Sequence, residues 1–521
     1  MSELVRPVLL SGLRVLDLTL DESFLCGRIL TGLGAYVTRV ESGSGKAGSA
    51  HIWGKGDYAL MRLAFEKAGG RVVDVDLETA PGQQLIKQLA ASADCLFEAF
   101  RPGYLGSLGL GYSEFQAINP RLIVVSITGF GQSGPRCDWV SCDLTLAALG
   151  GQLYVSGESG KPPLKLYGQQ VEHLGVLFAV NGLLLAIHRR NQTGRGQQVD
   201  VSLQECVSAA LDHVLPRYFG DGVVTRRQGS LAWNGSFKVF RCKDRYLLVS
   251  LPFDREMLAE LVANGENDGD SVEGKGGQVL ERQIGATRAI GPAIERLLKN
   301  FTSEELFRKA QLRRLPWAPV LTTGELLKND QLKSRSFFQG IKISCRRRAV
   351  VPRPLPFLVT VAPKVGTADV DRCRMDNIPV LPLGGIRVLD FTWVMAGPYA
   401  TRLLADFGAE VIKVQSRFVP GTEATNRTSY FKYWNRGKTS ITLNMSHPES
   451  IVLARRLVGL SDVLIESFSP RVMDNWGLTR EVLLQEKPDL IMVSMPAFGR
   501  TGPWRDCVAF GPTVHALSGL T

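Results

Sequence analysis

The chain repeats its beginning in its second half. Residues 385–414 read GIRVLDFTWVMAGPYATRLLADFGAEVIKV, and residues 12–40 read GLRVLDLTLDESFLCGRILTGLGAYVTRV, with apolar and polar segments in the same order. Two later segments, 98–135 and 466–503, match at one offset of 368 residues. At that offset the last residue, Thr521, corresponds to about Leu153 of the first unit. We therefore expect one complete unit, called copy one, followed by an incomplete second unit, called copy two.

Short apolar segments alternate with amphipathic ones at the start of copy one. Strands are expected at residues 14–17, 36–40, 71–75, 95–98 and 122–127. This alternation predicts an α/β fold with a doubly wound parallel sheet. Ligands of such sheets bind beyond the carboxyl ends of the strands. We therefore expect binding residues in the segments that follow Asp17, Glu41, Glu98 and Thr128.

Changes in composition divide the rest of the chain. A helical pattern from Glu172 to Asn191 ends at a glycine-rich segment, and a polar, glycine-rich stretch at 263–277 is expected to be a surface loop. We predict a smaller α+β domain between the copies. The expected division is 1–224 for the large domain of copy one, 225–335 for the small domain, 336–384 for a return segment and linker, and 385–521 for the partial second large domain.

The composition excludes several classes of protein. With 45% hydrophobic and 21% charged residues, the chain is a soluble globular protein rather than a disordered or fibrous one. Nine cysteines without a CxxC pair and six histidines without metal-ligand spacing predict neither a disulfide framework nor a metal site. The longest apolar run, 176–187, is shorter than the roughly 20 residues of a membrane span. The N-terminus lacks a signal-peptide pattern, so a cytoplasmic location is expected.

The net charge of +11 favours an anionic partner. The basic clusters, such as 346–348, are short and lack interleaved aromatic residues. A small molecule that carries phosphate groups is therefore expected, and nucleic acid is not.

Several motifs resemble those of the family III CoA-transferases, the group that includes formyl-CoA transferase and carnitine CoA-transferase. They are the repeated segment 385–414, residues 434–438 (WNRGK) and 462–468 (DVLIESF) in copy two, and residues 94–103, 129–131, 193–197 (TGRGQ) and 331–338 in copy one. The resemblance implies a Rossmann-like large domain, a small domain and interlocked subunits. It also implies that CoA and acyl-CoA are substrates and that no cofactor is permanently bound.

The resemblance also implies a catalytic carboxylate. In the family, an aspartate attacks the acyl-CoA thioester, and the anhydride and enzyme-bound thioester that follow pass CoA to a free carboxylic acid. Counting back from the TGRGQ segment places Glu172 at that position, with a side chain one methylene longer. A displacement of 1 Å can cost on the order of a hundredfold in rate. The alternative is that Glu172 only stabilises a helix N-terminus.

The CoA contacts that the resemblance implies come from both copies. In copy one they are Glu22, Ser23, Ser42, Ala99, Phe100, Arg101 and the segment from Val140 to Asp143, and in copy two Met395, Ala396, Asn435, Arg436 and Lys438. A guanidinium such as that of Arg101 matches a phosphate with two hydrogen bonds, although an ordinary surface arginine is the alternative. Copy one departs from the family pattern at 21–25, where Asp21 and Glu22 would repel phosphates.

The predicted function is transfer of CoA from an acyl-CoA to a small carboxylic acid through an enzyme-bound anhydride and a glutamyl thioester. One alternative is a catalytically inactive, CoA-binding half of a longer tandem transferase or transferase/lyase. Another is an isomerase like α-methylacyl-CoA racemase, but the histidine of that enzyme's acid–base pair falls on Cys142 and Phe510. The expected assembly is a homodimer or a pseudo-dimer within one chain, and the chain is expected to be a piece of a longer tandem protein.

Overall fold

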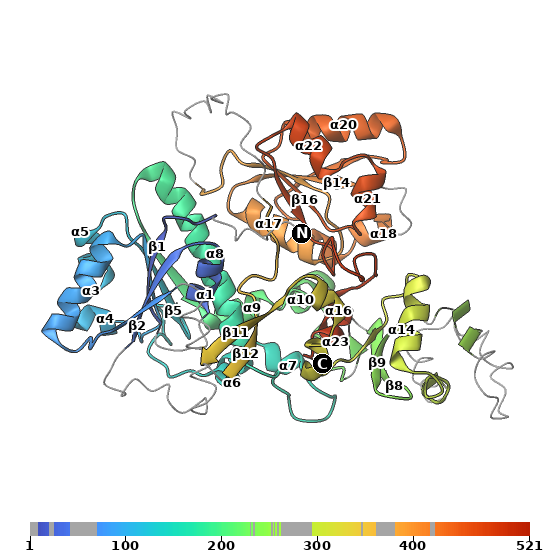
Figure 1. Cartoon of the computed structure of the whole chain (residues 1–521), viewed down its shortest axis with the longest axis horizontal. Helices are drawn as coiled ribbons and strands as arrows, with labels where there is room; N and C mark the ends of the chain where they lie inside the picture. The colour runs from blue at the N-terminus through green and yellow to red at the C-terminus, as the bar shows by residue number, and fades with distance from the viewer. Residues whose placement is uncertain are drawn as a thin grey trace.

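Two parallel sheets dominate the computed structural model, one in each copy (Figure 1). The structure describes residues 9–19, 25–41, 70–229, 294–344, 347–360, 381–416 and 422–520, together with most of 231–261. The first sheet has the strand order β3-β2-β1-β4-β5-β6 with every pairing parallel. Its strands are β1 (Arg14–Leu18), β2 (Tyr36–Glu41), β3 (Arg71–Asp74), β4 (Cys95–Glu98), β5 (Ile123–Thr128) and β6 (Gln198–Ser202). The predicted α/β class and the five predicted strands are confirmed.

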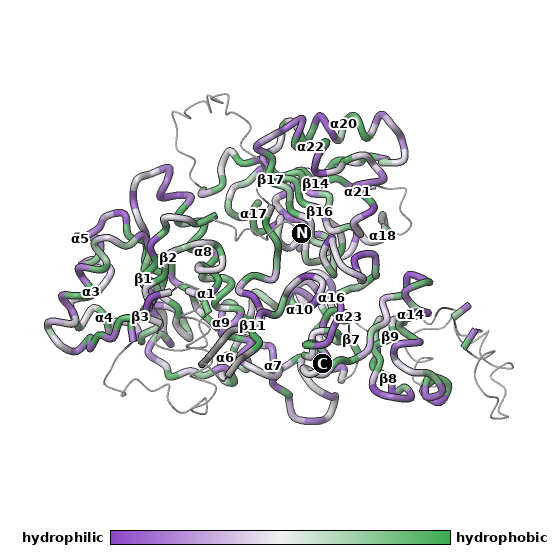
Figure 2. Tube along the Cα trace, viewed as in Figure 1, coloured by the Kyte–Doolittle hydropathy of each residue, from purple (hydrophilic) through white to green (hydrophobic). Residues whose placement is uncertain are grey.

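Helices cover both faces of this sheet. They are α1 (Cys26–Gly32), α3 (Ala80–Ser92), α4 (Tyr104–Ser107), α5 (Tyr112–Ile118), α6 (Asp143–Leu149), α7 (Gln152–Val155), α8 (Gln170–Thr193), α9 (Leu203–Ala209) and α10 (Val214–Asp221). On one face α1, α6, α8 and α9 form a core with the strands, and on the other α3, α4 and α5 do so. Figure 2 shows hydrophobic residues along the strands and polar ones on the outer turns of α3. The alternation of strands and amphipathic helices thus buries apolar side chains on both sides of the sheet.

Helix α8 crosses the centre of copy one. Among the described residues it is the one helix long and apolar enough to span a membrane, a test that the core helix of a soluble protein also passes. Here its residues Val176, Ala179, Val180 and Leu183 are buried in the core beside α1 and β5. It ends at Gly194, whose φ of +75° is a left-handed conformation that favours glycine.

A small antiparallel sheet follows copy one, with the order β10-β9-β8-β7. Its elements and the hairpin after them are β7 (Leu231–Ala232), β8 (Phe237–Arg241), β9 (Tyr246–Ser250), α14 (Ser303–Leu312), β10 (Ala318–Pro319), α15 (Thr323–Leu326), α16 (Asp330–Ser334), β11 (Phe338–Ser344) and β12 (Arg347–Pro352). Strand β9 and helix α14 pack around the buried Trp317. The domain limits at 224, 335 and 384 stay a prediction.

The second parallel sheet has the order β15-β14-β13-β16-β17, which is the order of the first sheet without its last strand. Its strands and helices are β13 (Arg387–Asp390), α17 (Ala396–Asp406), β14 (Glu410–Gln415), α18 (Thr422–Asn426), α19 (Ser429–Trp434), β15 (Thr439–Thr442), α20 (Pro448–Gly459), β16 (Val463–Glu466), α21 (Arg471–Asn475), α22 (Arg480–Glu486), β17 (Ile491–Ser494) and α23 (Gly511–Leu517). Helix α23 lies at the same offset of 368 residues from α6 that joins the repeated segments.

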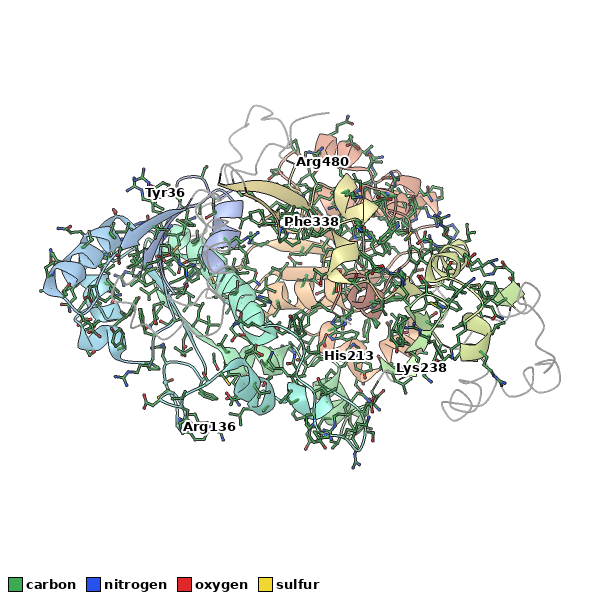
Figure 3. All side chains as sticks on the ribbon, turned by 60° about the horizontal axis from the view of Figure 1, so that its bottom comes forward. Tyr36, Arg136, His213, Lys238, Phe338 and Arg480 are labelled. Atoms are coloured by element: carbon green, nitrogen blue, oxygen red, sulfur yellow. The ribbon has the colours of Figure 1, made fainter. Side chains whose placement is uncertain are left out.

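Copy two contacts copy one through α10 and α19. The ring of His213 lies 5.2 Å from that of Tyr430 and 5.6 Å from that of Trp434, and Ser429 donates a hydrogen bond to Asp221. Figure 3 places His213 where the helices of the two copies meet. These contacts join the two copies between α10 and α19.

Copy two also contacts the small domain. The side chain of Gln331 in α16 donates to the carbonyls of Phe498 and Thr501 at 2.7 and 2.8 Å and accepts from the Trp504 N–H at 2.8 Å. Gln311 binds both backbone groups of Val508. The small domain therefore holds the loop that precedes α23.

Candidate functional site

The structure brings Glu172 and Asp143 together. Asp143 is the first residue of α6, and Glu172 lies in the first turn of α8. The two carboxyl groups share a side-chain hydrogen bond, and the Val171 N–H donates to Asp143 Oδ1 at 3.0 Å. Residues far apart in the sequence thus form a pair of carboxyl groups at the N-terminus of the longest described helix.

A cation neutralises this pair. Lys165 Nζ lies 2.6 Å from Asp143 Oδ2, and it also donates to the carbonyls of Leu166 at 3.1 Å and of Gly168. Burial raises the pKa of Asp143, but hydrogen bonds from Glu172, Lys165 and the Val171 N–H, with the charge of Lys165, bring that pKa below its ordinary value. Asp143 is therefore the anionic partner.

Two further titratable side chains flank the pair. Cys142 is exposed, and hydrogen bonds from Thr145 lower the pKa of its thiol. His173 follows Glu172 in α8. The site therefore combines carboxyl, ammonium, thiol and imidazole groups over a few residues.

The predicted CoA contacts of copy one are only partly described. Glu22, Ser23 and Ser42 lie outside the described residues. Ala99 and Phe100 follow β4, where the Phe100 N–H donates to Glu98 Oε2 at 2.9 Å. Arg101 is exposed at the carboxyl edge of the sheet. That position is the one expected for a phosphate contact, and the contact itself stays a prediction.

In copy two, Met395 and Ala396 lie where α17 begins, next to a strained residue. Val394 has a φ of +66°, which is rare for a β-branched side chain and often marks a functional site. Trp393 beside it is 54% exposed, and its N–H donates to Ser467 Oγ at 3.1 Å. This turn lies beyond the carboxyl ends of β13 and β16, where the fold places ligands.

The other three predicted contacts of copy two are engaged within the protein. Lys438 Nζ donates to Asp390 Oδ2 at 3.1 Å and to Asn435 Oδ1 at 2.9 Å, and its side chain is 1% exposed. Arg436 forms an ion pair with Asp406 at 2.9 Å. Burial lowers the pKa of Lys438 to about 8 although the carboxylate of Asp390 opposes this shift. A CoA contact of Asn435, Arg436 or Lys438 stays a prediction, and in this structure each of these side chains binds another group of the protein.

Asp390 and its counterpart Asp17 lie at the carboxyl end of the first strand of each copy, β13 and β1, in different surroundings. Both are fully buried and accept hydrogen bonds from the threonine two residues on. Burial opposes the ionisation of Asp390, but the charges of Lys413 and Lys438 and hydrogen bonds from two threonines lower its pKa. Burial raises the pKa of Asp17 and outweighs the charge of Arg39.

The sequence interpretation missed Lys165 and Val394. Lys165 lies in a proline-rich loop without a motif, and the neighbouring residues give no sign that it turns back to Asp143. Val394 lies in the segment 394–398, one of the two that copy one does not repeat, and this difference was the signal that could have marked it.

Comparison with known proteins accounts for both copies. The model of CoA-transferase family III matches residues 10–364 and 383–521. The chain belongs to CoA-transferase family III. The predicted membership is thereby confirmed, and the family match begins again where the sequence repeat begins.

Relatives with CoA-transferase names cover the chain to different extents. A probable CoA-transferase of Mycobacterium tuberculosis is 27% identical over 525 residues, which are 95% of this chain and 65% of that relative. A subunit of the succinyl-CoA:(R)-benzylsuccinate CoA-transferase of Thauera aromatica is 32% identical over 344 residues, covering 63% of this chain and 83% of that subunit. The chain thus spans somewhat less than two thirds of the mycobacterial relative.

A solved structure supports the same assignment. The crystal structure of a CaiB/BaiF family protein from Brucella suis superposes with a TM-score of 0.54 at 26% identity, covering 63% of this chain and 88% of that protein. This likeness supports the α/β fold of the family for this chain.

Proposed function

We propose that the chain transfers CoA from an acyl-CoA thioester to a free carboxylic acid, with Glu172 as the nucleophile. The observation that carries this proposal is the carboxyl group of Glu172 in the first turn of α8, held by Asp143, which is itself bound by Lys165. Family membership and the CoA-transferase names of the relatives support the reaction class.

The proposed chemistry proceeds in four displacements. The carboxylate of Glu172 attacks the thioester carbonyl, the C–S bond breaks, and a mixed anhydride and CoA thiolate form. The thiolate attacks the glutamyl carbonyl of the anhydride, which releases the donor acid and leaves a glutamyl thioester. The acceptor carboxylate attacks this thioester, and the returning thiolate then takes the acceptor acyl group and restores Glu172.

Succinyl-CoA is the first donor to test. It stands in the names of relatives that act on benzylsuccinate, D-citramalate and L-malate. For this chain, we propose a dicarboxylic acid as acceptor on that basis. The net charge of +11 suits an anionic donor and an anionic acceptor.

The contacts between copies support the proposal of a pseudo-dimer within one chain. The Gln331 contacts place the small domain against copy two, so two family units of one polypeptide lie together. A cytoplasmic location also stays a proposal, consistent with a family of soluble enzymes.

Mass spectrometry of the intact protein tests the nucleophile. After incubation with succinyl-, acetyl- or butyryl-CoA, we expect an adduct that hydroxylamine removes and that peptide mapping places on Glu172. The variant Glu172→Gln should lose the adduct and the exchange of CoA between acids. Adduct formation on another residue would contradict the assignment.

The matched control is Glu114→Gln. Glu114 also lies in the first turn of a helix, α5, and is exposed. If Glu172 only stabilised a helix N-terminus, both variants would lose similar small amounts of stability, typically about 0.3–1 kcal/mol, with the adduct retained.

A further inference from the structure

Glu172 forms a hydrogen bond to the carboxyl group of Asp143, and this contact affects whether Glu172 is ionised. A carboxylate attacks a thioester only in its ionised form. Two carboxyl groups joined by a direct hydrogen bond need one proton between them, because two anions would repel at that distance. The inference below rests on the proposed function of Glu172.

The contacts decide which partner is ionised. Asp143 accepts from the Val171 N–H at 3.0 Å, from Lys165 at 2.6 Å and from Glu172. Its side chain is 12% exposed, so water stabilises its charge little, and the three donors take over that task. The shared proton therefore belongs to Glu172, which is the donor in the pair.

The ammonium group of Lys165, which binds Asp143, is itself held by further hydrogen bonds. It also donates to the carbonyls of Leu166 and Gly168, and all three of its hydrogens thus find acceptors around the start of α8. A lysine held in this way favours the ionised form of Asp143.

We propose that Asp143, anchored by Lys165, is a positioning residue that holds Glu172 protonated in the resting enzyme, so that acyl transfer begins only after this proton leaves. The O–H bond of Glu172 breaks and the proton passes to water. The freed carboxylate oxygen then attacks the thioester carbonyl, and the C–S electron pair leaves on the sulfur of CoA.

Other titratable side chains lie beside the pair and on the elements packed against α6 and α8, among them Arg28 of α1, Tyr154 of α7 and Asp200 of β6. Cys142 precedes Asp143, His173 follows Glu172, and α9, which packs against both α6 and α8, contributes Glu205. The charge of Asp143 also acts on the pKa of both Cys142 and His173, in each case against the net lowering. The ion pair between Lys165 and Asp143 is the contact that the test removes. The pH dependence should therefore respond to changes at Asp143 and Lys165 in opposite directions.

The test compares pH profiles of adduct formation for the wild type, Asp143→Asn and Lys165→Met with succinyl-CoA. In the wild type, the rate should rise with pH along an acid limb. Asparagine keeps an oxygen for the Val171 N–H but removes the negative charge that retains the proton, so the limb should move to lower pH. Loss of the Lys165 charge should move it to higher pH. A shift of one pH unit changes the rate about tenfold at a pH on the limb.

Infrared difference spectroscopy supplies a second measurement, which does not depend on transferase activity. The C=O band of a protonated carboxyl group should be present near neutral pH in the wild type and absent from Glu172→Gln and Asp143→Asn. Acid limbs at the same pH in all three proteins, or an adduct on Asp143, would overturn the inference. If no thioester gives an adduct, the proposed function fails. In that case the infrared band tests the inference by itself: its presence supports a protonated Glu172 beside Asp143, and its absence overturns it.

Discussion

At the scale of single residues, Asp390 and Asp17 show how one motif can carry different electrostatics. Each lies at the carboxyl end of the first strand of its copy. Lys438 and Thr401 bind Asp390, whereas the residue of copy one at the offset of 368 from Lys438 is Gly70. A buried carboxylate depends on such partners, because water no longer stabilises its charge.

We therefore expect Asp390→Asn to lower the free energy of unfolding by about 3–5 kcal/mol, because two buried ammonium groups lose their counter-charge. Asp17→Asn should leave it unchanged or raise it at neutral pH, since burial already favours the uncharged form of Asp17. Chemical denaturation of both variants measures the difference. Equal losses would show that the lysines do not stabilise Asp390.

The pH dependence of these two residues should also differ in sign. The pKa of Asp390 lies below the ordinary value of about 3.9, so its contribution to stability is present above that value and is lost as the pH falls through the folded pKa. The pKa of Asp17 is raised, so its contribution is present at low pH and is lost as the pH rises through the folded pKa. Acid unfolding curves of the two asparagine variants should separate the effects.

At the scale of elements, the loop before α23 and its counterpart in copy one provide a matched comparison. Gly502 and Gly134 have φ values of +96° and +101°, so a side chain is strained at either position. A Cβ atom on Gly502 would lie 2.4 Å from Gln331 Oε1, whereas a Cβ atom on Gly134 meets nothing within 4 Å. The same turn is covered in one copy and uncovered in the other.

We expect Gly134→Ala to cost only backbone strain, roughly 1–2 kcal/mol. Gly502→Ala should cost more, because Gln331 would have to move and give up hydrogen bonds worth about 1 kcal/mol each. Thermal unfolding and limited proteolysis near residue 500 would measure the contrast. A similar cost for both variants would mean that α16 yields to the added methyl group.

At the scale of the whole molecule, the two copies meet at His213. Burial lowers the pKa of His213, although the charge of Asp212 opposes the shift. A histidine with a lowered folded pKa contributes stability that is present above the ordinary value of about 6.5 and is lost as the pH falls through the folded pKa. Acidification should therefore weaken the contact between α10 and α19.

His213→Phe keeps the aromatic contacts with Tyr430 and Trp434 and removes the titrating group. The drop of the melting temperature between pH 7 and pH 5 should become smaller in this variant. His447→Gln, which changes a residue at the start of α20, serves as the control and should behave like the wild type. An unchanged pH response in His213→Phe would place the acid-sensitive contact elsewhere.

Local patterns were enough for much of this molecule. Alternating apolar segments predicted the strands of the first sheet, and the repeated motifs predicted the family and the second sheet. Glu172 was predicted from the family resemblance, by counting back from the TGRGQ segment to the position of the family's aspartate. These features depend on short-range backbone preferences and on the spacing of side chains along one element.

The partners of these residues came only from the tertiary structure. Asp143 reaches Glu172 from α6, and Lys165 reaches Asp143 from the loop before α8. Gln331 reaches the loop before α23 across 167 to 173 positions of sequence. Such contacts carry no periodic signal, because they depend on how whole elements pack and on which buried polar groups need a partner. The sequence by itself determined the strands of the first sheet, the repeat and the position of the candidate nucleophile, whereas the packing of loops and helices decided its carboxyl partner, the cation beside that partner and the contact between the copies.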